Sequence, residues 1–361
     1  MLQTALSNWH QESGARMVDF AGWSMPIQYS SIVEEHDSVR QSCGLFDIAH
    51  MGRIWVRGEG AVAFLDHVAT NHVAQTKPGQ VRYSLVCNES GGILDDVLIY
   101  NLETEFLVVV NASNREKILA WFEVHRSGFD VEIDDRTQET FMLAIQGPQS
   151  QAILSTLTDV DLSAMKYYTV QRGRVDGVEA LVSRTGYTGE DGFEVIVENA
   201  EAVKVWTACA AAGEQSGLKP CGLGCRDTLR LEAAMPLYGH EMDETVDPIT
   251  AGLSFGVKLK KSSFLGHEAI RQKANESESL PKRIGVMLSG RRIAREGATL
   301  HVEAEQVGKV TSGTFSPTLQ KSLAMGYIDP KYATPGTAVE VDIRGKREPG
   351  EVTALPFYKR S

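Results

Sequence analysis

Hydrophobic and polar positions are spaced differently along the chain, and the spacing predicts both helices and strands. Ser31-Ile-Val-Glu34 has the form of a capping box, so we expect a helix over about 31–42 with its stop at Gly44. Segment 61–68 also has helical spacing. Period-2 or continuous apolar runs predict four strands: VRYSLVCN (81–88), ILDDVLIYNL (93–102), FLVVVNA (106–112) and FDVEID (129–134). The residues Asn88 to Gly92 form the expected turn between the first two of these strands.

The order of these elements predicts a split ferredoxin-like lobe over about 53–135. A helix carrying Ile118, Trp121 and Phe122 follows the third strand, with Asn111 or Ser113 as its expected cap. The resulting order is strand, helix, strand, strand, helix, strand, if one strand of the hairpin is counted as an insertion. A similar alternation continues to about residue 245.

The pattern changes near residue 283. Short segments of alternating hydrophobic and polar residues follow, separated by Gly and Pro turns and with little helical spacing. This pattern predicts a small all-β barrel or sandwich. The polar segment 273–283 reads as a linker. The chain is therefore expected to be α+β, with an all-β module at its C-terminal end.

Composition narrows the class of protein. A length of 361 residues suggests two or three domains, and a formal net charge of −11 argues against a general nucleic-acid binder. The start of the chain lacks a signal-peptide pattern, and no apolar window is long enough to span a membrane. Five cysteines at irregular spacing favour reduced thiols in the cytoplasm. Cys221 and Cys225 have no matching second pair, so we predict no metal site.

Two adjacent carboxylates, Asp95 and Asp96, stand inside an apolar strand, where an unpaired charge would be costly. Neighbours on a strand point to opposite faces, so only one of them can face a given cavity. This argues against a paired acid/base dyad on one face. A single carboxylate there could orient or deprotonate a nitrogen of a bound ligand. The alternative is structural, with one aspartate capping the turn and the other in an ion pair.

Two further segments carry candidate binding chemistry. In RTGYTGEDGFEV (184–195), Tyr187 could stack on a flat ring and Glu194 could accept hydrogen bonds from ring nitrogens. The segment is neither a Walker loop nor a dinucleotide fingerprint, and a plain glycine-rich hairpin is the alternative. In CGLGCRDTLRLEAAMPLYG (221–239), Arg226 and Arg230 share a helix face, where they could bind a carboxylate or belong to an internal ion-pair lattice. His50 is the only histidine in a motif-like setting.

The motifs together resemble one family. GARMVDFAGWSMPIQY, CGLFDIAHMG, NESGGILDDVLIY, AIQGP, SRTGYTGEDGFEV, GLGCRDTLRLEAAMPLYGHEMDE and VTSGTFSPTL occur in the order seen in aminomethyltransferases, the T-proteins of the glycine cleavage system. Each motif is weak alone, but seven in order cover nearly the whole chain. The resemblance implies a three-domain cloverleaf, with two ferredoxin-like or Greek-key α+β lobes and a jelly-roll-like C-terminal β-barrel.

The family's domain plan gives three expected domains. Domain 1 is a discontinuous folate-binding α+β unit of residues 1–51 and 136–248. Domain 2 is the ferredoxin-like unit of 52–135 with about 249–275, and domain 3 is the β module of 276–361.

The same resemblance implies a function and a set of site residues. T-proteins take an aminomethyl group from the dihydrolipoyl arm of H-protein, release ammonia and form methylenetetrahydrofolate, with tetrahydrofolate as co-substrate. Asp96 matches the carboxylate near folate nitrogens 5 and 10, and Glu194 and Arg226 match the folate-binding glutamate and arginine. Positions implied to line the folate site are Met51, Tyr83, Val109, Asn111, Tyr167, Tyr187 and Lys359. Lys359, followed by Arg360, replaces the family's common arginine, and Ala49 replaces its common serine.

Lipoylated H-protein is the implied partner, and a cytoplasmic monomer without nucleic-acid or membrane partners is expected. Because H-protein is usually acidic, a basic contact is needed, and Arg291, Arg292 and Arg295 are our candidates. Two alternatives remain open. One is another folate-dependent demethylase of the superfamily. The other is a non-catalytic folate-binding protein of iron–sulfur assembly, whose lysine-glycine-cysteine-tyrosine motif is not present around Cys221.

Overall fold

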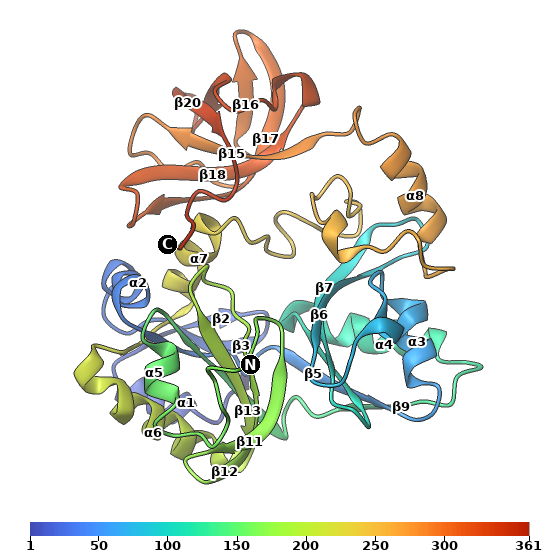
Figure 1. Ribbon diagram of the computed structural model, residues 1–361. Coiled ribbons are helices and arrows are strands. Elements are labelled where there is room, and N and C mark those ends of the chain that lie inside the picture. The colour runs from blue at the N-terminus through green and yellow to red at the C-terminus, as the bar shows by residue number, and fades with distance from the viewer. Residues whose placement is uncertain (361) are drawn as a thin grey trace. The chain divides into compact units, whose positions relative to one another are not determined.

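The computed structural model describes residues 1–360, and these divide into two compact units. The first contains Met1–Asp66, His72–Ser84 and Val97–Asp227, and the second contains His67–Asn71, Leu85–Asp96 and the chain from Thr228 onward. Both helices and sheets occur, so the predicted α+β class is confirmed (Figure 1). The three-domain boundaries and the cloverleaf arrangement stay predictions.

A six-stranded sheet forms the core of the first unit, in the order β11-β12-β13-β10-β4-β14. β10 pairs antiparallel with both β13 and β4, so the N-terminal segment enters a sheet built mainly from residues 140–220. The helices α5 and α6 pack on each other (Figure 1). Both also pack against β10. The elements are β4 (Gly44–Asp47), β10 (Thr140–Gln146), α5 (Ser150–Leu154), β11 (Val170–Val175), β12 (Val178–Ser183), β13 (Gly192–Glu198), α6 (Ala202–Gly213), β14 (Lys219–Pro220) and α7 (Leu223–Glu232).

The N-terminal residues add a small three-stranded sheet and two helices. Its strand order is β1-β3-β2. These elements are β1 (Leu2–Gln3), α1 (Ser7–Glu12), β2 (Arg16–Phe20), β3 (Trp23–Gln28) and α2 (Ile32–Gln41). The core beneath them is apolar and includes Leu6, Leu143, Phe193 and Trp206, all fully buried. Burial of such side chains is the main favourable term that holds the sheet and its helices together.

The predicted ferredoxin-like pattern is present as an antiparallel five-stranded sheet in the order β6-β7-β8-β5-β9. β6 stands at the edge of this sheet, so it is the strand of the hairpin that the ferredoxin-like order does not need. The elements are β5 (Gly52–Arg57), α3 (Ala61–Val68), β6 (Val81–Cys87), β7 (Ile93–Asn101), β8 (Phe106–Val110), α4 (Arg115–His125) and β9 (Glu132–Asp135). Short 3-10 turns accompany these elements, at Val73–Gln75 and Ala112–Asn114.

The helix predicted over 31–42 is confirmed as α2, but its predicted stop is wrong. Ser31 is the cap and accepts a hydrogen bond from the Glu34 amide. The helix ends at Gln41, and Gly44 already belongs to β4. Packing requires a glycine at position 44, because a Cβ there would lie only 2.4 Å from Cγ2 of Val39. The predicted caps of α4 are also wrong: Asn114 stands at the cap position and makes no capping side-chain hydrogen bond within residues 1–360, because a 3-10 turn intervenes.

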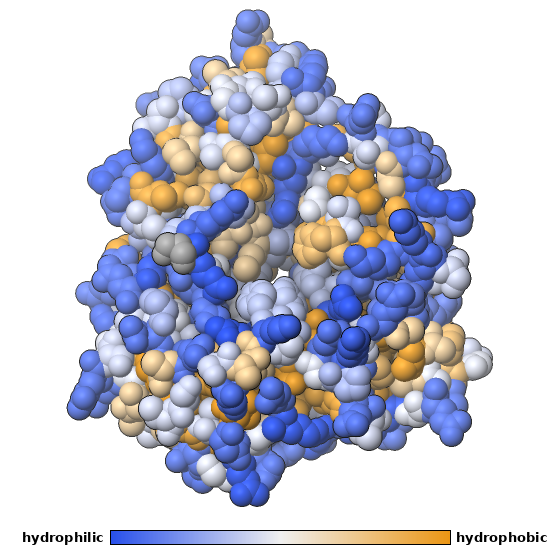
Figure 2. All heavy atoms as spheres, in the orientation of Figure 1, coloured by the Kyte–Doolittle hydropathy of each residue, from blue (hydrophilic) through white to orange (hydrophobic). Residues whose placement is uncertain are grey.

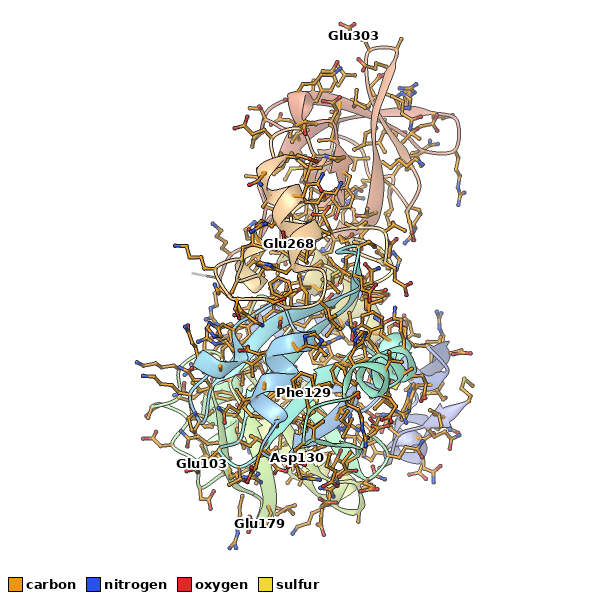
Figure 3. The ribbon with its side chains drawn as sticks, turned by 90° about the vertical axis from the view of Figure 1, so that its right-hand side faces the viewer. Glu103, Phe129, Asp130, Glu179, Glu268 and Glu303 are labelled. Carbon is orange, nitrogen blue, oxygen red and sulfur yellow. The ribbon has the colours of Figure 1, made fainter. Side chains whose placement is uncertain are left out.

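The C-terminal residues form the predicted barrel, which is closed and antiparallel in the order β15-β18-β17-β16-β19-β20. Its apolar core includes Val286, Leu300 and Val341. Glu303 lies in the turn between β16 and β17 (Figure 3). The elements of this region are α8 (His267–Asn275), β15 (Lys282–Leu288), β16 (Thr299–Val302), β17 (Glu305–Ser316), β18 (Lys321–Ile328), β19 (Ala338–Asp342) and β20 (Arg347–Thr353). The predicted linker overlaps the end of α8.

Within residues 1–360, none of the helices combines the length and apolar character needed to cross a bilayer. Hydrophilic residues are distributed over the whole face shown in Figure 2, with hydrophobic residues between them. All five cysteines are free thiols and buried, which agrees with the prediction of reduced cysteines.

Candidate ligand site

A buried carboxylate, Glu194, stands in the middle of β13 in the first unit. Its register places it opposite Ala144 on β10 and Ser183 on β12. The hydroxyl of Thr185 donates to Oε2 of Glu194, and the Tyr100 side chain also interacts with this carboxylate. Burial raises the pKa of Glu194, while Thr185, Arg226 and Tyr100 act in the opposite direction. Glu194 is therefore a desolvated acceptor, whose hydrogen bonds to a ligand would be strong.

Arg226, near the start of α7, is the cation beside this carboxylate. Its guanidinium carbon lies 4.7 Å from the centroid of the Tyr187 ring. Its Nη1 is buried and has no hydrogen-bond partner among residues 1–360. Burial lowers the pKa of Arg226, whereas Tyr187 and Glu194 raise it. A buried donor without a partner carries a free-energy cost that a ligand acceptor would remove.

These three side chains come from a strand, a helix and the loop between β12 and β13. The carboxylate accepts, the guanidinium donates, and the tyrosine presents an aromatic face. Such a set can hold a flat heterocycle that has N–H donors and a carbonyl acceptor on its edges. The structure thus brings Glu194, Arg226 and Tyr187 together, and their binding roles stay predictions.

His50 belongs beside this group, although the sequence did not single it out as a site residue. Its side chain is almost fully buried, and its Nδ1 has no hydrogen-bond partner in the described part of the chain. Its ring meets that of Phe20 edge-on, with 5.5 Å between the centroids. Burial, followed by the positive charge of Arg226, lowers the pKa of His50 to about 3. The ring is thus neutral at pH 7. The one sequence feature that pointed to His50 was its position beside Met51 in FDIAHMG.

The other predicted lining residues of the first unit differ in exposure. Val109 is buried on β8 and pairs with Leu98 on β7. Met51, Tyr83 and Asn111 are partly exposed. Tyr167 is 41% exposed, and its ring meets that of Tyr168 edge-on. No contact of these five with Glu194 or Arg226 is established, so their binding roles stay predictions.

Asp96 lies on β7 in the second unit, and the structure distinguishes it from its neighbour. Asp95 is fully buried, whereas Asp96 is partly exposed, in accord with strand alternation. The strand begins at a turn in which the Asn88 amide donates to the Gly92 carbonyl. A Cβ on Gly92 would lie 1.8 Å from the Glu244 carbonyl oxygen, so this glycine permits close backbone packing. Of the two carboxylates, Asp96 is thus the one accessible to solvent, and its ligand role stays a prediction.

Lys359 also belongs to the second unit and is exposed. The amide of the preceding residue, Tyr358, donates to the Glu232 carbonyl oxygen. The Glu232 carboxylate is in turn held by the hydroxyls of Ser316 and Thr318. The C-terminal segment is thus anchored just before Lys359, and the ligand role of Lys359 stays a prediction.

A possible ligand set for a metal occurs in the first unit. One potential ligand atom each from Glu35, Cys221 and Cys225 lies within 4.8 Å of the others, and all three side chains are buried. The Glu35 carboxylate, however, accepts from the backbone amides of Tyr29, Ser30 and Gly222. Burial raises the pKa of Cys225, which opposes the thiolate that a metal would need. We read this group as a backbone anchor.

The fold and site define an α+β protein with a buried carboxylate beside an arginine and with a C-terminal β-barrel. Two sequence models of known families match it, the "GCVT N-terminal domain" over residues 6–261 and the "Glycine cleavage T-protein C-terminal barrel domain" over residues 282–359. The chain belongs to the aminomethyltransferase family, the T-proteins of the glycine cleavage system.

Relatives of this family match the chain along its length. A protein named "Aminomethyltransferase" from Streptomyces coelicolor is 50% identical, covering 99% of this chain and 98% of that protein. One from Geobacillus kaustophilus is 46% identical and covers 99% of both. The crystal structure of glycine cleavage system aminomethyltransferase T from Bartonella henselae has a TM-score of 0.92 at 34% identity, covering 99% of this chain and 98% of that one.

Proposed function

We propose that this protein transfers the methylene of an aminomethyl group from lipoylated H-protein to tetrahydrofolate. The carbon–nitrogen bond of the aminomethyl thioether breaks and ammonia leaves. The carbon–sulfur bond then breaks, and two carbon–nitrogen bonds form to folate. The products are methylenetetrahydrofolate, ammonia and the dihydrolipoyl form of H-protein. The family membership and the full-length relatives named as aminomethyltransferases support this reaction.

The electrostatic interaction of Glu194 with Arg226 carries the proposal for folate. The aminopyrimidine edge of a pterin offers N–H donors, which suit a desolvated carboxylate. The pterin carbonyl is an acceptor, which suits the unpartnered Nη1 of Arg226. Tyr187, beneath the guanidinium, keeps that donor in place. Glu194 and Arg226 would therefore bind and orient the pterin.

Asp96 is the proposed catalytic carboxylate. Loss of ammonia leaves an electrophilic methylene, and the attack of a folate nitrogen on it develops positive charge. A carboxylate at that nitrogen stabilises the charge and accepts the proton that the nitrogen loses. Orientation of the two reactants supplies much of the remaining rate enhancement. Once the methylene is bound to one folate nitrogen it is an iminium, and water must be excluded because it would hydrolyse this iminium.

The barrel is the proposed contact for the acidic H-protein. Residues 282–360 carry 13 Lys and Arg against 8 Asp and Glu, whereas residues 1–281 carry 23 against 39. Arg295 is exposed, Arg292 pairs with Glu348 at 3.3 Å, and Arg291 lies over the Phe315 ring at 5.5 Å. A basic region in an acidic chain would steer an acidic partner to the barrel. A monomeric state and a cytoplasmic location complete the proposal.

The test is ammonia release from aminomethylated H-protein with and without tetrahydrofolate. We expect folate to stimulate release and methylenetetrahydrofolate to form in equal amount. Binding of folate without stimulated release would contradict the transferase reaction. Methyl transfer from a sulfonium substrate in the same preparation would instead identify a demethylase.

A further inference from the structure

Gln146 is a fully buried polar residue at the end of β10, in the AIQGP motif. Its Nε2 donates to the Thr185 carbonyl oxygen at 3.0 Å. Its Oε1 accepts from the Thr188 hydroxyl at 2.9 Å. The two partners stand on either side of the Gly186-Tyr187 dipeptide, so one amide side chain fixes the loop before and after Tyr187.

The loop is shaped to admit this amide. A Cβ on Gly186 would lie 2.0 Å from Oε1 of Gln146, and its three nearest heavy atoms all belong to that side chain. A Cβ on Gly192 would lie 2.4 Å from Nε2 of Gln146. Two glycines therefore clear the space that the Gln146 amide fills. Because the amide fits closely against glycines near both ends of the loop, it fixes the conformation of that loop.

Other contacts hold the loop at different places. Arg184 binds the Asp191 carboxylate, which closes the two ends. Arg40 binds Glu190 and the Thr188 carbonyl oxygen from α2. Neither bond reaches Thr185, whose hydroxyl donates to Glu194. Gln146 alone among these three holds Thr185 and Thr188 together.

We infer that Gln146 is a positioning residue for the ligand site, acting through Thr185 on Glu194 and through Tyr187 on Arg226. This inference rests on the proposed function, because it takes the ligand to be tetrahydrofolate. Without the Gln146 amide, Tyr187 leaves its place over the guanidinium, and Glu194 loses the fixed direction of its Thr185 hydrogen bond. Because misorientation of polar groups at a site is costly, folate affinity falls.

The first test compares Gln146→Leu with Gln149→Leu, an exposed glutamine three residues further on. Tetrahydrofolate affinity is measured by calorimetric titration, and Tm by thermal unfolding. We expect Gln146→Leu to raise Kd by about tenfold or more, from the lost polar bonds, while KM for H-protein stays within about twofold. Gln149→Leu leaves the folate Kd and the KM for H-protein unchanged. A Gln146→Leu protein that loses Tm but keeps wild-type Kd overturns the inference.

A second test uses the clash at Gly186. Gly186→Ala forces a methyl group against the Gln146 amide, so it raises the folate Kd in the wild-type background. Adding Gln146→Ala removes the clashing atoms. We therefore expect Gly186→Ala to cost at least threefold less affinity in the Gln146→Ala background than in wild type. Equal costs in both backgrounds contradict the inference. A wild-type protein that binds no folate would instead overturn the proposed function.

Discussion

The Arg226 guanidinium carbon lies 4.7 Å from the centroid of the Tyr187 ring, so the helix α7 and the loop between β12 and β13 meet at one cation–π contact. Both side chains are partly exposed, and a contact of this kind contributes on the order of 1–2 kcal/mol. We expect Tyr187→Leu to weaken tetrahydrofolate binding by about tenfold or more. Tyr187→Phe keeps the ring and stays within about threefold. Equilibrium titration of the two variants checks this, and equal losses would show that the hydroxyl matters, not the ring.

Glu194 combines a stability cost with a binding role. Its pKa is raised in the folded protein, so folding is disfavoured as pH rises above the ordinary glutamate range, and this penalty disappears in acid. Glu194→Gln removes the charge. We therefore expect the ligand-free variant to match or exceed the wild-type Tm at pH 7, with the difference shrinking toward pH 4. Folate affinity should nonetheless fall by at least tenfold. A variant that binds folate normally would exclude the carboxylate from the site.

His50 gives a pH dependence of the opposite sense. Its pKa falls to about 3 in the folded protein, against an ordinary value near 6.5. Between these values the unfolded chain binds a proton that the folded chain does not, so acidification destabilises the fold by up to about 1.4 kcal/mol per pH unit.

Replacement by His50→Gln removes this term. We expect the variant's Tm to fall less steeply than the wild-type Tm between pH 6.5 and 4. The exposed Gln149 supplies the control, since Gln149→Leu changes no titratable group and should leave the slope unchanged. Parallel slopes for His50→Gln and wild type would contradict a lowered pKa of His50 in the folded protein.

The H-protein contact is tested by charge reversal on the barrel. Arg295 is the cleanest of the three candidates, because Arg292 is paired with Glu348 and Arg291 packs on Phe315. We expect Arg295→Glu to raise KM for H-protein by about threefold to tenfold at low salt and to leave folate affinity unchanged. Lys346→Glu, another exposed barrel cation, is the matched control. If both variants raise KM equally, the effect is one of net charge and the assignment of Arg295 is wrong.

The local sequence pattern was sufficient to predict those helices and turns for which capping residues, periodicity and turn residues all agree. The cap at Ser31, the helix over 61–68 and the hairpin around Asn88–Gly92 were all predicted from the sequence, because caps, periodicity and turn residues act over a few positions. Gly44 shows the limit of that reasoning. It looked like a helix stop, but it is a glycine because Val39 and Cys221 pack against it, and that packing depends on tertiary contacts.

The site residues also divide into those that the sequence could predict and those that depend on tertiary contacts. Glu194, Arg226 and Tyr187 were chosen by family resemblance and chemical type, and they do meet. Their support could not be predicted, because Gln146 acts from another strand and through backbone atoms. His50 could be noticed but not assigned, since its unpartnered Nδ1 and its lowered pKa arise only from burial beside Arg226.

Single-turnover ammonia release from aminomethylated H-protein, at saturating tetrahydrofolate, tests the central claim that Asp96 is the catalytic carboxylate. The comparison is between wild type and Asp96→Asn, with folate Kd measured on both. We predict a rate about 10²–10⁴-fold lower in Asp96→Asn, with Kd within about threefold of wild type. Folate-stimulated release at the wild-type rate in Asp96→Asn would contradict the claim.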